Sequence, residues 1–423
     1  MLSFGGAQFA SGIYMAFVSY YLMMFCTDVA LIPPAATAIL LLCYRLFSVV
    51  NGQVTALLIN RSNFKQGKYR PYFKWFSLPF AISLAALGLT PVINITGRII
   101  YATITLILCE LCWLALHTAS LSMLPYLSLD DVNRTKFVSF SNSSAILAFI
   151  LVGTFMLPLA SFFGGGDRNK GFPLTLALFA IIIPPLYLNA YFRLKERHYS
   201  ESPGKPFIKD MFLAVGRNKR LLLFLAGYCL YYMADTFKNL TTYYYMTYNM
   251  GRADLIPVII LAGLISPLAV QPIIPRLLSL AKKETLIIFG LFASSCASLL
   301  MLAAGNNPYA LISCAVLYGM FTAIVANLVF AVMASFSDEL RIRQNISMSE
   351  ILAAAMDLSA TVGAAITSST VPMVMAAFGY IANSASQTAG TLTGIRALYI
   401  PCTAAGMILS GLVLLPGLSK KRS

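Results

Sequence analysis

Long apolar runs recur along the whole chain, and short polar segments separate them. Twelve runs are long enough to cross a bilayer as a helix, which takes about 20 residues. They lie at residues 4–26, 34–59, 75–95, 99–126, 138–163, 173–192, 221–247, 254–275, 285–304, 307–335, 346–380 and 392–416. This pattern predicts an all-α polytopic membrane protein with twelve transmembrane helices.

The longest hydrophilic stretch, residues 193–220, lies near the middle of the chain. It combines charges of both signs with serine, proline and glycine, a composition typical of a linker. Six predicted helices precede it in residues 1–192, and six follow it in residues 221–423. We therefore expect two six-helix bundles joined by a cytoplasmic linker.

Lysine and arginine residues are distributed unevenly between the loops. Of the 30, the loops after even-numbered spans and the C-terminal tail carry 23, and the loops after odd-numbered spans carry 5. Because basic loops stay in the cytoplasm, we expect both termini on the cytoplasmic side of a bacterial inner membrane. The net charge of +15 then faces anionic lipid and requires no nucleic-acid partner.

The composition, 59% hydrophobic and 11% charged, argues against a soluble enzyme. The eight cysteines lie in apolar runs, where a free thiol acts as a small hydrophobic side chain. Cys109 and Cys112 have no second pair of ligands nearby in the sequence, so no metal site is expected. A glycine-rich phosphate loop is also lacking, and we expect neither a cofactor nor enzymatic activity.

Ionisable side chains inside the predicted spans are functional candidates, because a charge in a bilayer is costly. They are Arg45, Glu110, His117, Asp235, Lys238, Glu350 and Asp357. Asp235 and Lys238 are three residues apart, which favours an intrahelical salt bridge. Arg45 either pairs with Glu110 or faces a cavity, and His117 either titrates near neutral pH or packs as a hydrogen-bonded residue. A cavity-facing role is favoured for Asp357, because no basic residue shares its helix at that depth.

Tyrosines are concentrated at the end of the seventh span, where Tyr243, Tyr244, Tyr245 and Tyr248 follow one another closely. We interpret this group as an interfacial aromatic belt at the outer membrane face. Tyr231 or Tyr232, within the same span, remains a candidate platform for stacking on a sugar.

Several segments, taken in order, resemble one known family. The first span ends in Tyr20-Tyr21 followed by Thr27-Asp28-Val29, and the second contains the run from Arg45 to Asn51. The following loop reads Gly67-Lys68-Tyr69-Arg70-Pro71, and Gly164-Gly165-Gly166-Asp167 follows the fifth span. This set is similar to the glycoside–pentoside–hexuronide:cation symporters, the melibiose-permease-like members of the major facilitator superfamily. The resemblance covers the whole chain and implies two helical halves that expose a midplane cavity alternately.

The resemblance also implies a cation site, which is altered here. Family members bind the cation in an oxygen cage on spans 2 and 4, built around two carboxylates. The matching positions in this chain are Ser48, Asn51 and Gly52, and only Asn51 keeps the family's residue. Since anionic oxygens offset the cost of dehydrating a hard cation, we expect this remnant to bind Na⁺ poorly.

The solute-binding positions implied by the resemblance differ as well. Gln8, His117 and Asn142 replace charged residues, Leu121 replaces a tryptophan, and Asp357 replaces a lysine. Trp113 lies one turn from His117 and is expected to line the same cavity. The expected solute site consists of Gln8, Arg45, Trp113, His117, Asn142 and Asp357.

These features predict a secondary transporter that moves a small polar solute, a glycoside, pentoside or hexuronide, by alternating access. Proton coupling or no coupling is favoured over Na⁺ coupling, with Glu110 or Asp357 as the proton carrier, because a low-dielectric cavity favours a neutral carboxyl group. Two alternatives stay open: a transporter of an amphipathic lipid- or steroid-like substrate, and a membrane sensor that binds without transport. The expected partners are the solute, H⁺ and the lipid bilayer, and we expect a monomer.

Overall fold

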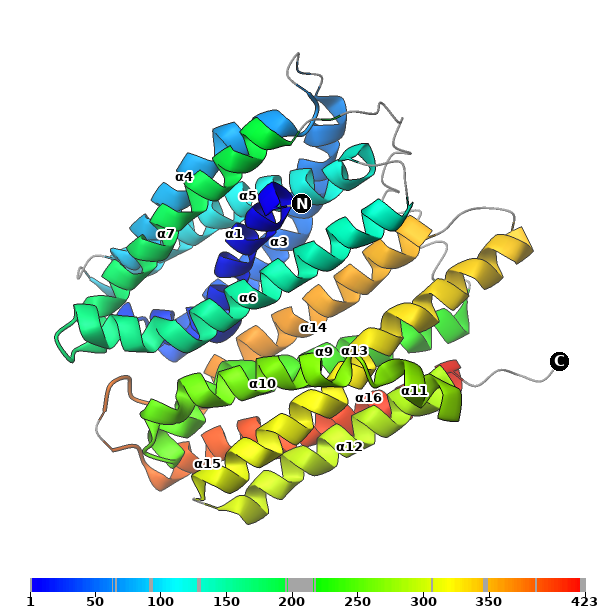
Figure 1. Cartoon of the computed structure of the whole chain (residues 1–423). Helices are drawn as coiled ribbons and strands as arrows, with labels where there is room; N and C mark the ends of the chain where they lie inside the picture. Colours follow the sequence, from blue (N-terminus) through cyan, green and yellow to red (C-terminus); the bar gives the residue numbers. More distant parts are fainter. Residues whose placement is uncertain are drawn as a thin grey trace. The chain divides into compact units, whose positions relative to one another are not determined.

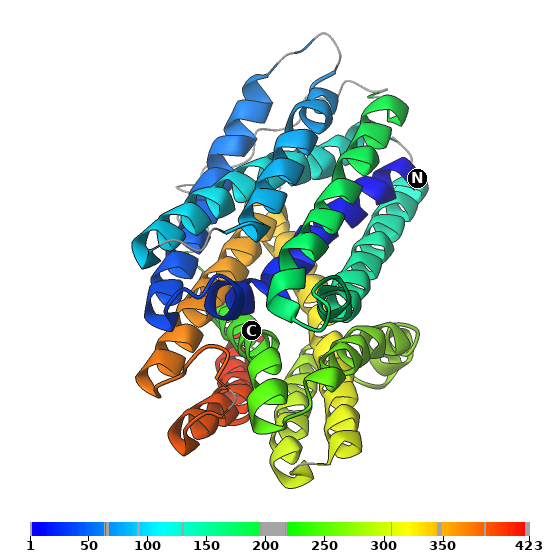
Figure 2. The same cartoon turned by 90° about the vertical axis from the view of Figure 1, so that its left-hand side faces the viewer.

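The computed structural model describes residues 2–62, 64, 67–90, 94–127, 131–194, 196, 216, 218–305, 307–344, 349–384 and 386–418. All regular secondary structure within these ranges is helical, which confirms the all-α prediction for them. The chain forms two compact units, Met1–Gly204 and Lys205–Ser423 (Figures 1 and 2). The boundary between them falls inside the segment predicted to be a linker.

The N-terminal unit is built from long helices that pack side by side. They are α1 (Leu2–Tyr20), α2 (Leu22–Met24), η1 (Phe25–Val29), α3 (Pro34–Arg61), α4 (Arg70–Gly88), α5 (Ile95–Leu127), α6 (Asp131–Phe163) and α7 (Arg168–Arg193). Helix α1 packs against α6, α7 and α5, and α3 packs against α5. At Gly12 an added Cβ would lie 2.8 Å from the Cβ of Ala148, so glycine permits the close approach of α1 and α6.

The first predicted span is not one straight helix. It bends by 61° between α1 and the α2–η1 segment. The backbone leaves the helical conformation at Tyr21 (φ −123°, ψ −14°). The Tyr21 hydroxyl donates to the carbonyl oxygen of Gly153 on α6 at 2.6 Å. Neither proline nor glycine occurs at the bend, so the apolar pattern alone did not reveal it.

The C-terminal unit has a similar construction with more breaks. Its elements are α9 (Lys219–Tyr244), η2 (Tyr245–Asn249), η3 (Ala253–Leu255), α10 (Ile256–Val270), α11 (Ile274–Leu280), α12 (Lys283–Ala304), α13 (Pro308–Gln344), α14 (Ser349–Ala377), α15 (Ala389–Ala397), η4 (Leu398–Cys402) and α16 (Thr403–Leu418). Helix α9 packs against both α14 and α16, and α12 packs against α13 and α16. α9 therefore lies at the centre of this unit's helix contacts.

Two short segments of the C-terminal unit, η2 and η4, are π-helical. Pro401 lies inside η4 and has no backbone N–H to donate within the helix. A local π-helical turn accommodates such a missing donor, and turns of this kind often lie at functional sites.

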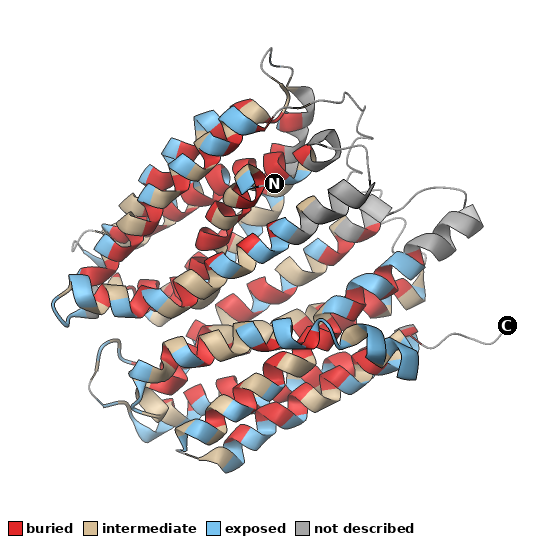
Figure 3. Ribbon diagram, in the orientation of Figure 1, coloured by how far each residue is buried: buried red, intermediate tan, exposed pale blue. Residues whose placement is uncertain are grey.

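Nine helices among the described residues are long and apolar enough to cross a membrane, and the bent first pair would make ten. Large apolar side chains such as Ile39, Ile104, Phe155 and Phe289 are exposed, as expected for faces that contact acyl chains. Exposed positions recur along the helices of both units (Figure 3). The predicted spans at 75–95 and 221–247 correspond to α4 and α9, which are not among the nine. Helix α9 carries Asp235 and Lys238 within its apolar stretch, whereas the charged residues of α4, Arg70 and Lys74, lie at its start. The total of twelve spans stays a prediction.

Candidate functional site

A carboxylate held by hydroxyl groups lies inside the N-terminal unit. Glu110 of α5 is 1% exposed. Its Oε2 accepts hydrogen bonds from the hydroxyls of Tyr44 at 2.7 Å and Tyr14 at 3.1 Å. Its Oε1 accepts one from the Ser48 hydroxyl at 2.5 Å. Tyr44 and Ser48 are four residues apart on α3, so both point from the same helix face.

Glu110 has no cationic partner within ion-pair distance among the residues that the structure describes. The Arg45 guanidinium lies over the ring of its neighbour Tyr44, 5.5 Å from the centroid, and does not contact Glu110. The proposed Arg45–Glu110 pair is therefore wrong. The physical reason is that consecutive helix residues point about 100° apart, so the face that carries Tyr44 and Ser48 to Glu110 excludes Arg45.

A second cluster of polar side chains, carried by α1 and α5, lies next to the Glu110 cluster. The Ser11 hydroxyl accepts from Trp113 Nε1 at 2.9 Å and is hydrogen-bonded to His117 Nδ1 at 3.0 Å. The His117 ring stacks on Trp113, with centroids 4.8 Å apart and an interplanar angle of 16°. Trp113 also packs on Tyr14 at 5.6 Å, which joins this group to the Glu110 cluster. Trp113 and His117 therefore lie together, and their expected place in one solute cavity stays a prediction.

Gln8 adds one more contact to this group. We refer to Gln8, Ser11, Trp113, His117 and Ser120 together as the polar strip. Its Nε2 donates to the hydroxyl of Ser120 on α5 at 2.9 Å, and the Gln8 side chain is buried. Ser11, Tyr14, Tyr44 and Ser120 were not predicted as site residues. Their signal in the sequence is weak, because serine and tyrosine are frequent throughout the apolar runs.

The three positions that match the family's cation cage make different contacts in the structure. Ser48 reaches Glu110, whereas Asn51 turns its Oδ1 to the Thr55 hydroxyl at 3.1 Å. Among the described residues, the buried Asn51 Nδ2 has no hydrogen-bond partner. A Cβ added at Gly52 would lie 3.7 Å from Leu114, in ordinary contact, so that position has room for a side chain. Of the three positions, only Ser48 contacts Glu110.

Two other predicted solute-site residues are exposed. Asn142 of α6 makes no hydrogen bond with the described residues. Asp357 of α14 belongs to the C-terminal unit. Their assignment to the solute site stays a prediction.

In the C-terminal unit, Asp235 and Lys238 do not form the direct salt bridge that we favoured. Asp235 accepts from Asn239 Nδ2 at 3.0 Å and from the Tyr318 hydroxyl at 3.4 Å. The Lys238 ammonium donates to the Sδ of Met301 at 3.2 Å. The prediction was wrong because spacing along one helix ignores partners on other helices.

The interpretation of the tyrosines that end α9 as an interfacial belt is also wrong for Tyr243, Tyr244 and Tyr245, which are buried. Tyr245 stacks on Tyr399 with centroids 4.4 Å apart. Tyr244 packs edge-on against Tyr380 at 5.5 Å. These rings hold helices of one unit together.

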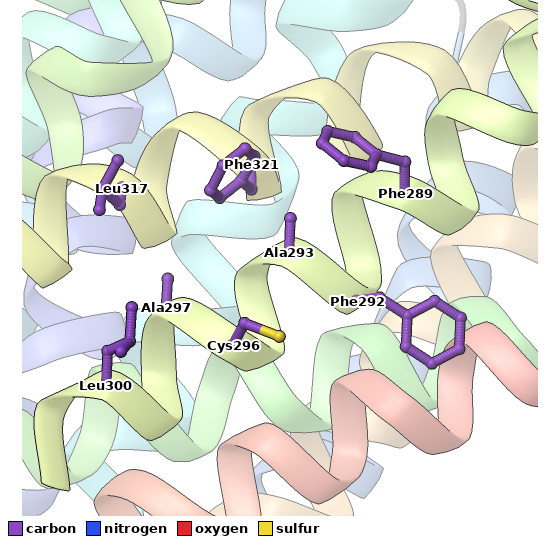
Figure 4. A pocket seen from close by; sticks show the side chains of 8 residues that line it. All are labelled: Phe289, Phe292, Ala293, Cys296, Ala297, Leu300, Leu317 and Phe321. Atoms are coloured by element: carbon purple, nitrogen blue, oxygen red, sulfur yellow. The ribbon is translucent and has the colours of Figure 1, made fainter. Parts of the chain in front are cut away.

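An apolar pocket of about 410 Å³ lies between α12 and α13 (Figure 4). Its lining consists of Phe289, Phe292, Ala293, Cys296, Ala297, Leu300, Leu317 and Phe321. These side chains offer no strong hydrogen-bonding group to a sugar hydroxyl. The pocket therefore does not compete with the polar strip as a site for a polar solute.

The sequence profile of a family described as MFS/sugar transport protein matches residues 3–415. The chain belongs to this family. Its relatives include the isoprimeverose transporter of Lactiplantibacillus pentosus, 26% identical over 98% of this chain and 87% of the relative. Another is the putative glycoside/cation symporter YagG of Escherichia coli, 25% identical over 99% and 91%. These matches confirm the resemblance to the glycoside–pentoside–hexuronide:cation symporters.

The fold comparison agrees with the family assignment. The crystal structure of the nucleoside transporter NupG superposes with a TM-score of 0.69 and 13% identity, with both chains fully covered. At this identity the likeness concerns the fold alone. The protein is an integral membrane protein of a transporter family.

Proposed function

We propose that this MFS/sugar transport protein carries a small polar solute, a glycoside, pentoside or hexuronide, across a bacterial inner membrane by alternating access. The proposal includes two six-helix halves, a linker at residues 193–220, both termini in the cytoplasm and a monomeric state. Two relatives, an isoprimeverose transporter and a putative glycoside/cation symporter, support this class of solute.

One observation carries the proposed coupling: Glu110 is buried, and among the described residues its hydrogen-bond partners are three hydroxyl groups. No lysine or arginine of the described part of the chain lies within ion-pair distance of it. A fixed arginine or lysine partner would have held the group ionised throughout the cycle. We therefore assign Glu110 as the group that binds and releases the coupling proton.

The solute would bind on the polar strip formed by Gln8, His117 and Trp113, together with Arg45, Asn142 and Asp357. Trp113 and His117 present a stacked pair of flat rings, and the polar edges around them suit hydroxyl groups of a sugar. The strip is continuous with Glu110 through Tyr14. Solute binding can therefore influence the proton site by contact.

The test is uptake into proteoliposomes containing the purified protein, with labelled isoprimeverose and a panel of glycosides, pentosides and hexuronides as probes. We expect an inward pH gradient to drive accumulation of at least one probe, and an inward Na⁺ gradient to have no effect. Accumulation driven by Na⁺ alone would overturn the coupling assignment. Competition by amphiphiles but by no sugar would overturn the solute class.

Glu110→Gln is the decisive variant, because the glutamine side chain still accepts hydrogen bonds but cannot bind and release a proton. We expect it to lose gradient-driven accumulation and to retain solute exchange at equal concentrations on both sides. Asp167→Asn is the matched control, because Asp167 lies in the exposed loop after α6 and pairs with Lys170 there. Accumulation by Glu110→Gln at the wild-type level would exclude Glu110 as the proton carrier.

A further inference from the structure

The Lys238 side chain ends in a cage of aromatic rings and sulfur within the C-terminal unit. Its Nζ lies 4.4 Å from the ring centroid of Tyr318 on α13 and 4.4 Å from that of Tyr399 on η4. The Sδ of Met301 on α12 is 3.2 Å from the same nitrogen. Lys238 is only 6% exposed, so its ammonium group is buried within the protein.

No carboxylate oxygen lies within ion-pair distance of Lys238 in the described part of the chain. Asp235 acts on it electrostatically from one turn earlier on α9. Tyr318 connects the two, because its ring faces the ammonium while its hydroxyl donates to Asp235 Oδ1 at 3.4 Å. The buried thiol of Cys314 also lies beside the cage.

One ring of the cage, Tyr399, packs against a further aromatic ring. Tyr245 stacks on Tyr399 with ring centroids 4.4 Å apart and an interplanar angle of 16°. Tyr399 lies in the π-helical segment η4, and Tyr245 begins the π-helical segment η2. The irregular turn η4 thus places one of the two rings that face Lys238, and η2 places the ring that packs on it. Irregular helical turns cost stability and often persist where a site requires them.

Aromatic faces and a nearby carboxylate are the chemistry with which proteins bind ammonium ions. We propose that this cage is a site for a primary ammonium ion, permanently filled by Lys238 as a cation tethered to the chain. The tethered charge would give the C-terminal unit an internal cation, which fits a transport cycle without Na⁺. The role of this charge in transport rests on the proposed function, whereas the existence of the ammonium site does not.

Chemical rescue tests the site. Lys238→Ala removes a segment equal in size to n-propylammonium. We expect the variant to unfold at a lower temperature in detergent, and added n-propylammonium to restore the unfolding temperature saturably. Uncharged n-propanol is the size-matched control and should fail to restore it. The wild type and Lys170→Ala, whose lysine lies on the surface, should respond to neither compound.

Two results would overturn the site: equal rescue by n-propanol, which indicates a merely apolar cavity, or no rescue of a Lys238→Ala variant that elutes as a folded monodisperse species. Lys238→Met tests the role of the charge while filling the space. We expect its solute exchange to fall about tenfold, in line with the loss of two desolvated cation–π contacts. Wild-type exchange by Lys238→Met would overturn the role.

The rescue measurement reads stability and needs no transported solute. A failure of pH-driven uptake would therefore contradict the proposed coupling and leave the ammonium site standing. A failed rescue in a protein that accumulates solute would contradict only the site.

Discussion

Tyr44 of α3 donates a 2.7 Å hydrogen bond to Glu110 of α5, and this contact joins α3, which carries the three remnant cation positions, to α5. The Tyr44 hydroxyl donates to the carboxylate at a place where a cationic side chain would otherwise be expected. The two residues are far apart in the sequence, and only helix packing brings them together.

Tyr44→Phe should therefore destabilise the N-terminal unit. The change removes one of three donors from a buried carboxylate, and we expect a loss of about 1.5–3 kcal/mol in the free energy of unfolding. Thermal or denaturant unfolding in detergent measures it. Tyr309→Phe is the control, because Tyr309 is 80% exposed. Equal stability of Tyr44→Phe and the wild type would show that the hydroxyl is dispensable.

Ser11→Ala should weaken solute binding. Its hydroxyl contacts both Trp113 Nε1 and His117 Nδ1, so its loss leaves the two rings without their common polar anchor. We expect a several-fold rise in the KM for transport and a stability loss of about 1 kcal/mol, since Trp113 keeps a second acceptor in the Ser11 carbonyl. The control is Ser313→Ala, whose hydroxyl bonds only within its own turn. An unchanged KM would argue against a role for these rings in binding.

Ser48→Asp should create a response to cations that the wild type lacks. The new carboxylate would stand beside Glu110, and two adjacent carboxylates favour a shared proton or a bound cation. We expect Na⁺ to stabilise this variant by about 1–3 kcal/mol at saturating concentration, measured by thermal unfolding against choline. Gly52→Asp serves as the comparison, because it adds a carboxylate without replacing the Ser48 contact. Identical unfolding in Na⁺ and choline would contradict this expectation.

Gly67→Ala should disturb the entry into α4. Gly67 has φ +113°, and a Cβ there would lie 2.8 Å from Oε1 of Glu196. Glu196 accepts from the backbone N–H groups of Lys68, Tyr69 and Arg70 at 2.8, 2.8 and 3.1 Å, and so caps the start of the helix. Strain and a displaced cap together should cost about 2–3 kcal/mol.

The control for that variant is Gly390→Ala, where the nearest atom to an added Cβ is 3.7 Å away. Unfolding in detergent distinguishes the two. If both variants were equally stable, the positive φ and the Glu196 contact would not constrain residue 67.

Sequence reasoning succeeded where the signal is local. Apolar runs predicted the helices within a few residues, as at 285–304 against α12 (Lys283–Ala304). It failed where partners on other helices decide the contact: Asp235 and Lys238 were paired with each other, whereas Tyr318 of α13 donates to Asp235 and Lys238 donates to Met301 of α12. The bend at Tyr21 escaped it for the same reason, because a hydrogen bond to Gly153 accompanies a turn that no glycine or proline marks.

The sequence by itself determined that this protein is a helical membrane protein of a transporter family, because hydropathy and ordered family motifs are properties of the chain alone. Only the tertiary structure decided which hydroxyls hold Glu110 and which rings surround Lys238. The reason is physical: a buried charge is stabilised by whichever groups come within a few ångströms, and packing between helices, not spacing along one, sets those distances.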